Sequence, residues 1–345
     1  MLHHIKGIDH SLVGVKDLEA ARAAYEKLGF TITPRGSHIG WGTANYCIMF
    51  EEDYIELLGI VDPSLETNGL DKALAERGEG LLGLALSTEA PGETHRSLVE
   101  AALEPSDLIT LKRRLELPEG EVLPEFRLIR LTSSAGLEAK HLFICHHLTP
   151  ELIRRPEWLQ HANGALYLNA VVVVVEDPGA LADYYRRLCG WINVTLTDNT
   201  LTVRFGRGSL IFVNDRDIDL LFPGLTMEDE IPALPYLIAM SVAVENLEQT
   251  EAMLEASGVS KRRIANGTLR VRPEDACGLL PGGIDIHWNV RPFRLHHFHI
   301  GHGDGIVRIA KMQDNRNFRL LIDILGHLAA IIADRLVDGS KAAGR

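Results

Sequence analysis

The sequence predicts an α+β protein made of four βαβββ units, which pair into two domains and are followed by a C-terminal helix. Two observations carry this prediction: a strand and helix pattern ending at a glycine returns along the chain, and short extended segments follow each copy. Hydrophobic residues make up 46% of the chain and charged residues 24%, which is typical of a packed globular protein. A length of 345 residues suits two domains of ordinary size.

The first unit opens with the strand pattern IDHSLVGV and continues into the helix pattern DLEAARAAYEKLGF. Leu18, Ala21 and Tyr25 recur in it at helical spacing. Asp17 can cap the start of this helix, and Gly29 can adopt the left-handed conformation that ends it. Three extended segments, FTITPRG, ANYCIMFE and DYIELLGIV, complete the unit.

Three further copies follow the same order. The second is less regular and contains GLLGLALSTEAPGETHRSLVEAALE, FRLIRLTS and KHLFICHH. The third runs from VVVVVEDPGALADYYRRLCGW through INVTLTD, LTVRFGR and SLIFVND, and the fourth from LIAMSVAVENLEQTEAMLEASGV to GGIDIHWNV. We therefore place one domain at residues 1–150 and a second at 165–293, with a packed connection between them. Residues 294–345 belong to no repeat and hold a His-rich turn and the C-terminal helix.

Charge and cysteine spacing narrow the choice of partners and compartment. The formal net charge of −12 and the absence of a basic stripe in the sequence argue against nucleic acid. The start lacks the residue order of a secretory signal, and charges interrupt the apolar stretch 318–337, so we expect a cytoplasmic protein with no membrane partner. No CxxC pair occurs, and a reducing compartment fits the four widely spaced cysteines, Cys47, Cys145, Cys189 and Cys277.

A paired βαβββ unit with a histidine on its first strand and a glutamate on its last resembles the vicinal oxygen chelate superfamily, which includes glyoxalase I and the extradiol dioxygenases. The segments RGSHIGWGTANY, DYIELLGI and FICHHLTPELIRRPEWLQHANGA are similar to bacterial glyoxalase-like domain proteins. The resemblance covers the chain from Ile5 to Arg291. It implies that adjacent units form a cupped sheet around a divalent metal ion, which chelates two neighbouring oxygens of the substrate.

The resemblance also implies which residues bind the ion. His10 matches the ligand on the first strand, and Glu56 matches the ligand on the last strand of the first unit. His146 lies nearest the corresponding position of the second unit, with His147 beside it. Two imidazoles and one carboxylate suit Fe, Mn, Zn or Ni without choosing among them.

Other positions depart from the family pattern. The first strand of the second unit, at 81–86, offers no ligating side chain, so the metal site has only three expected ligands. In the second domain, Ala170 and Ala239 stand where ligands would be needed. We therefore expect the second domain to be structural.

Residues near the expected ligands supply the remaining candidates. Glu56 and His38 are the candidate catalytic residues, because a carboxylate or an imidazole can act as a general base. The loop SHIGWGTAN contributes Trp41, Thr43 and Asn45, which suit a pocket wall that binds substrate. Each of these residues also has an ordinary structural explanation, as a hydrogen-bonded strand residue or part of a packed turn.

Two features of the C-terminal segment remain separate from this site. The cluster from His296 to His302 could bind metal adventitiously. An apolar stripe on the last helix suits packing on its own domain or a homo-oligomer contact; it consists of Leu321, Leu325, Leu328 and Ile332.

The leading hypothesis is a metal-dependent glyoxalase-like enzyme that acts on a small oxygenated metabolite as a lyase, isomerase or dioxygenase. The alternative is a non-catalytic protein of the same fold that binds or sequesters a small molecule. The fold alone does not separate the two, because the same scaffold hosts both functions.

Overall fold

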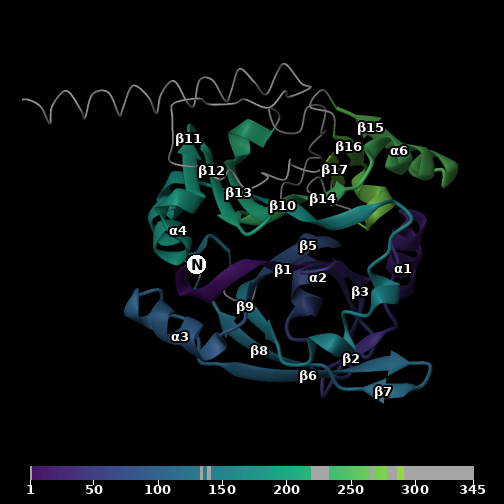
Figure 1. Cartoon of the computed structure of the whole chain (residues 1–345), viewed down its shortest axis with the longest axis horizontal. Coiled ribbons are helices and arrows are strands. Elements are labelled where there is room, and N and C mark those ends of the chain that lie inside the picture. The colour runs from purple at the N-terminus through teal and green to yellow at the C-terminus, as the bar shows by residue number, and fades with distance from the viewer. Residues whose placement is uncertain are drawn as a thin grey trace, which may run out of the picture. The chain divides into compact units, whose positions relative to one another are not determined.

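The structure, a computed structural model, describes residues 2–132, 135–137, 141–218, 233–264, 268–277 and 286–290. It confirms the predicted α+β class: two mixed β-sheets carry short helices (Figure 1). The expected His-rich turn and C-terminal helix lie outside the described residues, so their role in oligomerisation stays a prediction. Among the helices that the structure describes, none has the length and apolar character needed to cross a bilayer.

The first sheet contains the two N-terminal βαβββ units. Its strand order is β2-β3-β4-β1-β5-β9-β8-β6-β7, and β2 also pairs with β6, so the sheet closes on itself. Its strands are β1 (Ile5–Val15), β2 (Gly36–His38), β3 (Thr43–Met49), β4 (Tyr54–Ile60), β5 (Gly80–Thr88), β6 (Ile109–Leu117), β7 (Gly120–Val122), β8 (Glu125–Arg130) and β9 (Leu142–His147). The closed arrangement gives the sheet an inner face that can enclose a cavity.

Three helices accompany this sheet: α1 (Leu18–Lys27), α2 (Leu70–Arg77) and α3 (Pro91–Glu100). Helix α1 begins and ends as the sequence predicts. The Asp17 side chain accepts hydrogen bonds from the backbone N–H groups of Glu19 and Ala20. Gly29 follows the helix with a φ of 85°, a conformation that glycine adopts at little cost.

The first unit differs from the sequence prediction in its second strand. We expected FTITPRG to be extended and paired, but regular pairing begins only at Gly36. The preceding residues make isolated contacts, such as the Thr33 N–H bond to the Cys47 carbonyl (2.9 Å). Pro34 has no N–H group and cannot donate to a ladder, which limits pairing here. The sequence prediction also missed β6 and β7.

The second sheet repeats the same arrangement in the order β11-β12-β13-β10-β14-β17-β16-β15. Helices α4 (Ala182–Cys189) and α6 (Leu247–Ala256) follow its two opening strands, β10 and β14. The strands are β10 (Ala165–Val175), β11 (Val194–Thr197), β12 (Thr200–Phe205), β13 (Gly208–Asn214), β14 (Tyr236–Val244), β15 (Lys261–Arg263), β16 (Leu269–Val271) and β17 (Ile286–Val290). Both sheets therefore have the strand and helix order expected from the repeats.

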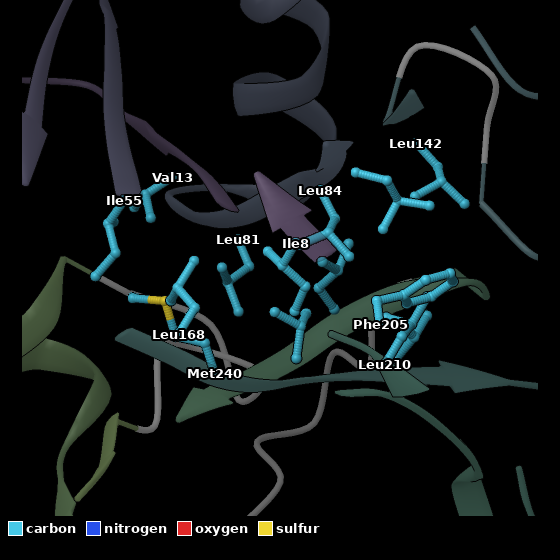
Figure 2. Packing of buried hydrophobic residues seen from close by; sticks show 14 of the residues in the cluster. Ile8, Val13, Ile55, Leu81, Leu84, Leu142, Leu168, Phe205, Leu210 and Met240 are labelled. Atoms are coloured by element: carbon cyan, nitrogen blue, oxygen red, sulfur yellow. The ribbon is translucent and has the colours of Figure 1, made fainter. Parts of the chain in front are cut away.

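One hydrophobic core joins the two sheets. Figure 2 shows Ile8 and Leu84 of the first sheet pointing toward Leu168 and Met240 of the second, and all four side chains are buried in one cluster. Apolar contact of this kind is the main favourable term in folding. Because this face of the first sheet packs against the second sheet, the polar residues of β1 and β4 lie on its other face, around a cavity.

Candidate active site

A β-bulge at the start of β1 directs its histidine into the cavity. The pairing of β1 with β5 shifts register between Ile8 and His10, so Asp9 is the extra residue. Without the bulge, residues two apart would face the same side of the sheet. With it, Ile8 enters the hydrophobic core while His10 lines the cavity. The bulge therefore separates a packing residue from a candidate ligand.

Asp9 fixes the orientation of His10 from behind. One Asp9 oxygen, Oδ1, lies 2.6 Å from His10 Nδ1 and 3.0 Å from His147 Nε2. Burial opposes ionisation of Asp9, but the neighbouring His147 and His10 outweigh it and hold the pKa of this carboxyl well below its usual range. An ionised carboxylate is only an acceptor, so His10 donates from Nδ1. When His10 is neutral, its Nε2 atom carries the free lone pair.

Glu56 faces this nitrogen across the cavity. Its Oε2 atom lies 3.6 Å from His10 Nε2, and its Oε1 atom accepts a hydrogen bond from Asn45 Nδ2 (2.5 Å). Burial acts to raise the pKa of Glu56, but His10, His38 and the Asn45 hydrogen bond together lower it. The side chain is therefore a carboxylate at neutral pH, which suits either metal binding or proton transfer.

His38 is the second imidazole of the cavity. Its Nε2 atom lies 4.0 Å from Glu56 Oε1, and its Nδ1 atom is 2.9 Å from the Thr43 hydroxyl. Burial is the largest influence on His38 and lowers its pKa, so the ring is neutral at neutral pH. The Trp41 ring lies beside it, with centroids 5.6 Å apart. A neutral imidazole held in this way can accept a proton.

The cavity has a volume of about 170 Å³ and contains most of the expected site residues. It brings together His10, His38, Trp41, Thr43, Asn45 and Glu56. Thr43 and Asn45, expected to bind substrate, hydrogen-bond to His38 and Glu56 through their side chains. Their binding of substrate stays a prediction.

His146 is the expected residue that the structure does not bring to this cavity. Successive side chains of a strand point to opposite faces, and Cys145 faces the cavity. His146 therefore points the other way, and its Nδ1 atom lies 2.8 Å from the Thr88 carbonyl oxygen. Its neighbour His147 is on the inner face and contacts Asp9. The geometry therefore does not favour His146 as the third ligand, because it lies on the opposite face of β9 from Cys145.

Several site residues were missed in the sequence. Among the described residues, the one group of three possible metal donors within 4.8 Å of one another is Asp9, His10 and Cys145. Burial raises the pKa of the Cys145 thiol well above its usual value, so it stays protonated at neutral pH. Arg113 of β6 also lines the cavity. The aspartate directly before His10 was the visible signal for an orienting carboxylate.

A closed sheet of two βαβββ units with His10 and Glu56 on its inner face defines a protein of the vicinal oxygen chelate class. The comparison with protein families agrees: the model of a family described as a glyoxalase-like domain matches residues 8–189, more than half of the chain. The chain belongs to this glyoxalase-like domain family.

Solved structures share the fold at low sequence identity. A hypothetical protein from Staphylococcus aureus matches with a TM-score of 0.56 and 12% identity, over 83% of this chain and 100% of that one. A variant of 4-hydroxymandelate synthase from Streptomyces coelicolor matches with a TM-score of 0.55 and 13% identity, over 85% and 94%. A fusion of a xylose isomerase-like TIM barrel with a 4-hydroxyphenylpyruvate dioxygenase matches with a TM-score of 0.50 and 12% identity, over 85% and 50%. At these identities the likeness concerns the fold alone.

A comparison with curated sequences gives a short match of a different kind. One component of the A-type ATP synthase of Methanoregula boonei is 31% identical over 80 residues. The match covers 20% of this chain and spans only 38% of that protein. It carries no conclusion about function.

Proposed function

We propose that this protein is a metal-dependent enzyme of the vicinal oxygen chelate type that acts on a small oxygenated metabolite. A divalent ion, Fe, Mn, Zn or Ni, would be held by His10 Nε2 and the Glu56 carboxylate. The reaction would be that of a lyase, an isomerase or a dioxygenase. Membership of the glyoxalase-like family supports the general class, and the likeness to solved structures supports the scaffold on which the site is built.

The observation that carries the proposal is the pair of acceptor atoms formed by His10 and Glu56. Asp9 accepts the hydrogen bond from His10 Nδ1. In the neutral ring, the lone pair of Nε2 then faces Glu56 Oε2, which lies 3.6 Å away. The repulsion between two such acceptors is relieved by a metal ion bound between them or by a proton on Nε2, and the proposal assigns the position to the metal ion. A carboxylate behind a metal-binding histidine is also the usual way in which proteins fix the histidine tautomer.

The donor set fits an ion with few protein ligands. The wall contributed by β5 consists of Leu82 and Gly83, which offer no donor side chain, and His146 lies on the other face. With only His10 and Glu56 as ligands, most coordination positions remain for substrate oxygens. Retention of the ion should therefore depend strongly on a chelating ligand.

The residues around the ion would supply the proton chemistry. When bound, a divalent ion acts as a Lewis acid that polarises a substrate oxygen. His38 is neutral and lies beside Glu56, so it is placed to accept a proton from the polarised substrate. Thr43 holds the His38 ring from its other nitrogen, and Asn45 holds Glu56. Apolar walls from Phe126, Phe143 and other residues would limit the access of water to this reaction.

The alternative function is binding or sequestration without chemistry. The small number of protein ligands favours it, because a weakly held ion could be absent from the working protein. The Asp9–His10 pair favours the enzyme, because a ligand cavity alone has no need for a buried carboxylate behind a histidine. Metal content separates the two proposals.

The experiment compares metal content by mass spectrometry and metal affinity by calorimetry in the wild type, His10→Ala and Glu56→Ala. Loss of an inner-sphere ligand should weaken binding by several kcal/mol, since the remaining donor is poorly compensated. His146→Ala is the matched control and should retain the ion, because it removes a histidine from the outer face. Equal content in all variants, or no ion in metal-supplemented wild type, would leave the binding protein as the better proposal.

A further variant tests the competing donor group. If Asp9 and Cys145 held the ion with His10, Cys145→Ser would reduce metal content as much as His10→Ala does. The proposal predicts that Cys145→Ser retains the ion. Glu56→Ala then distinguishes the two placements, because Glu56 is a ligand only in the proposed one.

A further inference from the structure

Arg113 is a buried cation on the wall of the cavity. Its side chain belongs to β6, is 5% exposed and lines the same cavity as His10 and Glu56. One guanidinium nitrogen donates to Asn45 Oδ1 (2.9 Å), and another lies 3.7 Å from the Cys47 sulfur. The guanidinium carbon is 5.9 Å from the centroid of the Phe126 ring. These contacts fix the orientation of the group and leave most of its five N–H donors without a strong acceptor.

The neighbours of Arg113 on the same strand show what is unusual about it. Lys112 lies 2.6 Å from a Glu125 oxygen, and Arg114 lies 3.8 Å from a Glu121 oxygen. Arg113 is the buried member of the three, and within the described part of the chain no carboxylate contacts its guanidinium directly. Asn45, which accepts from Arg113 and donates to Glu56, separates the two charges. A buried charge normally has a close partner of opposite sign, because desolvation is costly.

The backbone beside Arg113 is shaped to admit the guanidinium. Gly36 of β2 pairs with Leu115 of β6, next to this side chain. A Cβ atom at Gly36 would lie 2.1 Å from an Arg113 nitrogen and 2.2 Å from Asn45 Oδ1. Any other residue at position 36 would therefore displace the Arg113–Asn45 hydrogen bond. The absence of a side chain at Gly36 leaves the space that the Arg113 guanidinium occupies.

The charges that line the cavity are unbalanced. Arg113, Arg130 and Lys112 contribute positive charge, and Glu56 is the single carboxylate among the described residues of the wall. Lys112 has its own partner outside the cavity in Glu125. A divalent ion beside Glu56 would increase the positive excess further. This imbalance lies in a chain with a formal net charge of −12, so it is a local feature.

We propose that Arg113 anchors a carboxylate of the substrate, and that the substrates are small organic acids with an oxygen atom next to that carboxylate. This proposal rests on the proposed function in placing the substrate in the same cavity. Arginine suits the role because its planar fork binds a carboxylate through two parallel hydrogen bonds. The apolar part of the acid would pack against Leu128 and the rings of Phe126 and Phe143, which line the cavity.

Calorimetry with two matched probes tests the anchor: phenylpyruvate, an aromatic 2-oxo acid, and phenylpyruvamide, which keeps two neighbouring carbonyl oxygens but is neutral. The wild type should bind the acid more tightly than the amide. Arg113→Gln, which can still donate to Asn45, should lose roughly ten- to hundredfold in affinity for the acid and little for the amide. Arg114→Gln is the matched control and should behave as wild type, since Arg114 is an exposed neighbour on the same strand.

Two more variants keep the test valid if Arg113→Gln does not fold. Arg113→Lys keeps the charge but not the fork and should lose part of the affinity. Gly36→Ala retains the arginine but fills the space of its guanidinium, and should show the same selective loss of affinity for the acid. An acid affinity that is unchanged in the folded variants overturns the proposal, and so does a wild type that binds neither probe at millimolar concentration or does not prefer the acid.

The measurements are repeated on metal-loaded and chelator-treated protein. Dependence on Arg113 that persists without metal supports the anchor even if the metal proposal fails. Metal content that stays at the wild-type level in Arg113→Gln, with no selective loss of acid affinity, overturns the anchor while leaving the proposed function intact.

Discussion

The two sheets of this protein share a backbone arrangement and differ in the side chains on their inner faces. In the first sheet, β1 shifts register against β5 between Ile8 and His10. In the second, β10 shifts register against β14 between Leu168 and Ala170, at the corresponding place. The bulge is therefore a property of the repeated unit. The second half keeps the bulge although Ala170 stands where the first half has His10, so this backbone geometry does not depend on the histidine.

The inner faces of the two sheets carry opposite chemistry. His10 and Glu56 of the first sheet correspond, by strand register, to Ala170 and Ile211 of the second. Ile211 packs against a buried apolar cluster that includes Ala239. The second half thus has hydrophobic side chains at the two positions that correspond to His10 and Glu56, which supports the proposal that it is structural. The comparison shows that a few substitutions on the same backbone arrangement distinguish a candidate site from a packed core.

The largest effect should come from the core that the halves share. Leu168 is fully buried between the sheets, so Leu168→Ala should destabilise the protein by about 2–5 kcal/mol. Because the core belongs to both halves, urea should unfold the protein in one transition, whose midpoint shifts as a whole in the variant. Fluorescence and circular dichroism measure this transition. Leu196→Ala, at a side chain that is 40% exposed, is the control and should change stability little. Two separate transitions, with only one of them shifted, would show that the halves fold independently.

The next effect concerns a carboxyl group at the junction of the halves. Asp53 Oδ1 accepts a hydrogen bond from the Leu168 N–H group, and burial raises the pKa of Asp53 to about 7. A raised carboxyl pKa means that the folded state resists ionisation, so stability falls as pH rises from about 4 to about 7. Asp53→Asn keeps the acceptor and should be more stable than wild type at pH 8 by up to about 4 kcal/mol. Equal urea midpoints for the two proteins at pH 8 would contradict this expectation.

The fold was largely accessible from the sequence, because strand alternation, helix spacing and glycine ends recur in each unit. Asp17 and Gly29 are examples, since each acts at an end of α1 as its residue type predicts. The strand β6 was missed because Arg113 and other charged residues interrupt its apolar alternation. That interruption was itself a signal, because Arg113 occupies the inward-facing position between Leu111 and Leu115, and an arginine at such a position indicates a buried charge.

The candidate site was less accessible, because it depends on which face each strand residue occupies. His10 and Glu56 were identified through the family resemblance, and the structure places them together. His146 was chosen over His147 because two adjacent histidines on a strand give no indication of which one faces inward. The bulge at Asp9 also escapes prediction from the sequence, since it depends on pairing with β5.

A smaller pH effect should come from the connection between the halves. The Thr31 N–H group donates to His161 Nδ1, and His161 Nε2 lies 2.9 Å from the Met49 carbonyl, so both ring nitrogens are satisfied when the ring is neutral. Burial lowers the pKa of His161 to about 4. The folded state therefore resists protonation, and stability should fall by at most about 3 kcal/mol as pH drops from about 6.5 to 4. His161→Gln should flatten this part of the urea-midpoint profile, and an unchanged slope would contradict the assignment.

The smallest expected effect tests the comparison most directly, because it gives the first half a residue of the second. Asn169 lies in the β10 bulge where β1 has Asp9, and its amide donates to Ser241. Asp9→Asn should preserve the bulge, since the second half forms it with asparagine. An amide can still accept from His10 Nδ1, but it lacks the charge that fixes the tautomer and raises the basicity of Nε2. Metal affinity should therefore fall by about 10–100-fold, as is usual for loss of a carboxylate behind a ligand histidine.

Calorimetric titration of the metal-stripped protein measures this change, and the urea midpoint of the metal-free form checks that the fold is retained. If Asp9→Asn bound the ion as tightly as wild type, Asp9 would have only a structural role in the bulge. The difference between the two sheets would then depend on His10 and Glu56 alone.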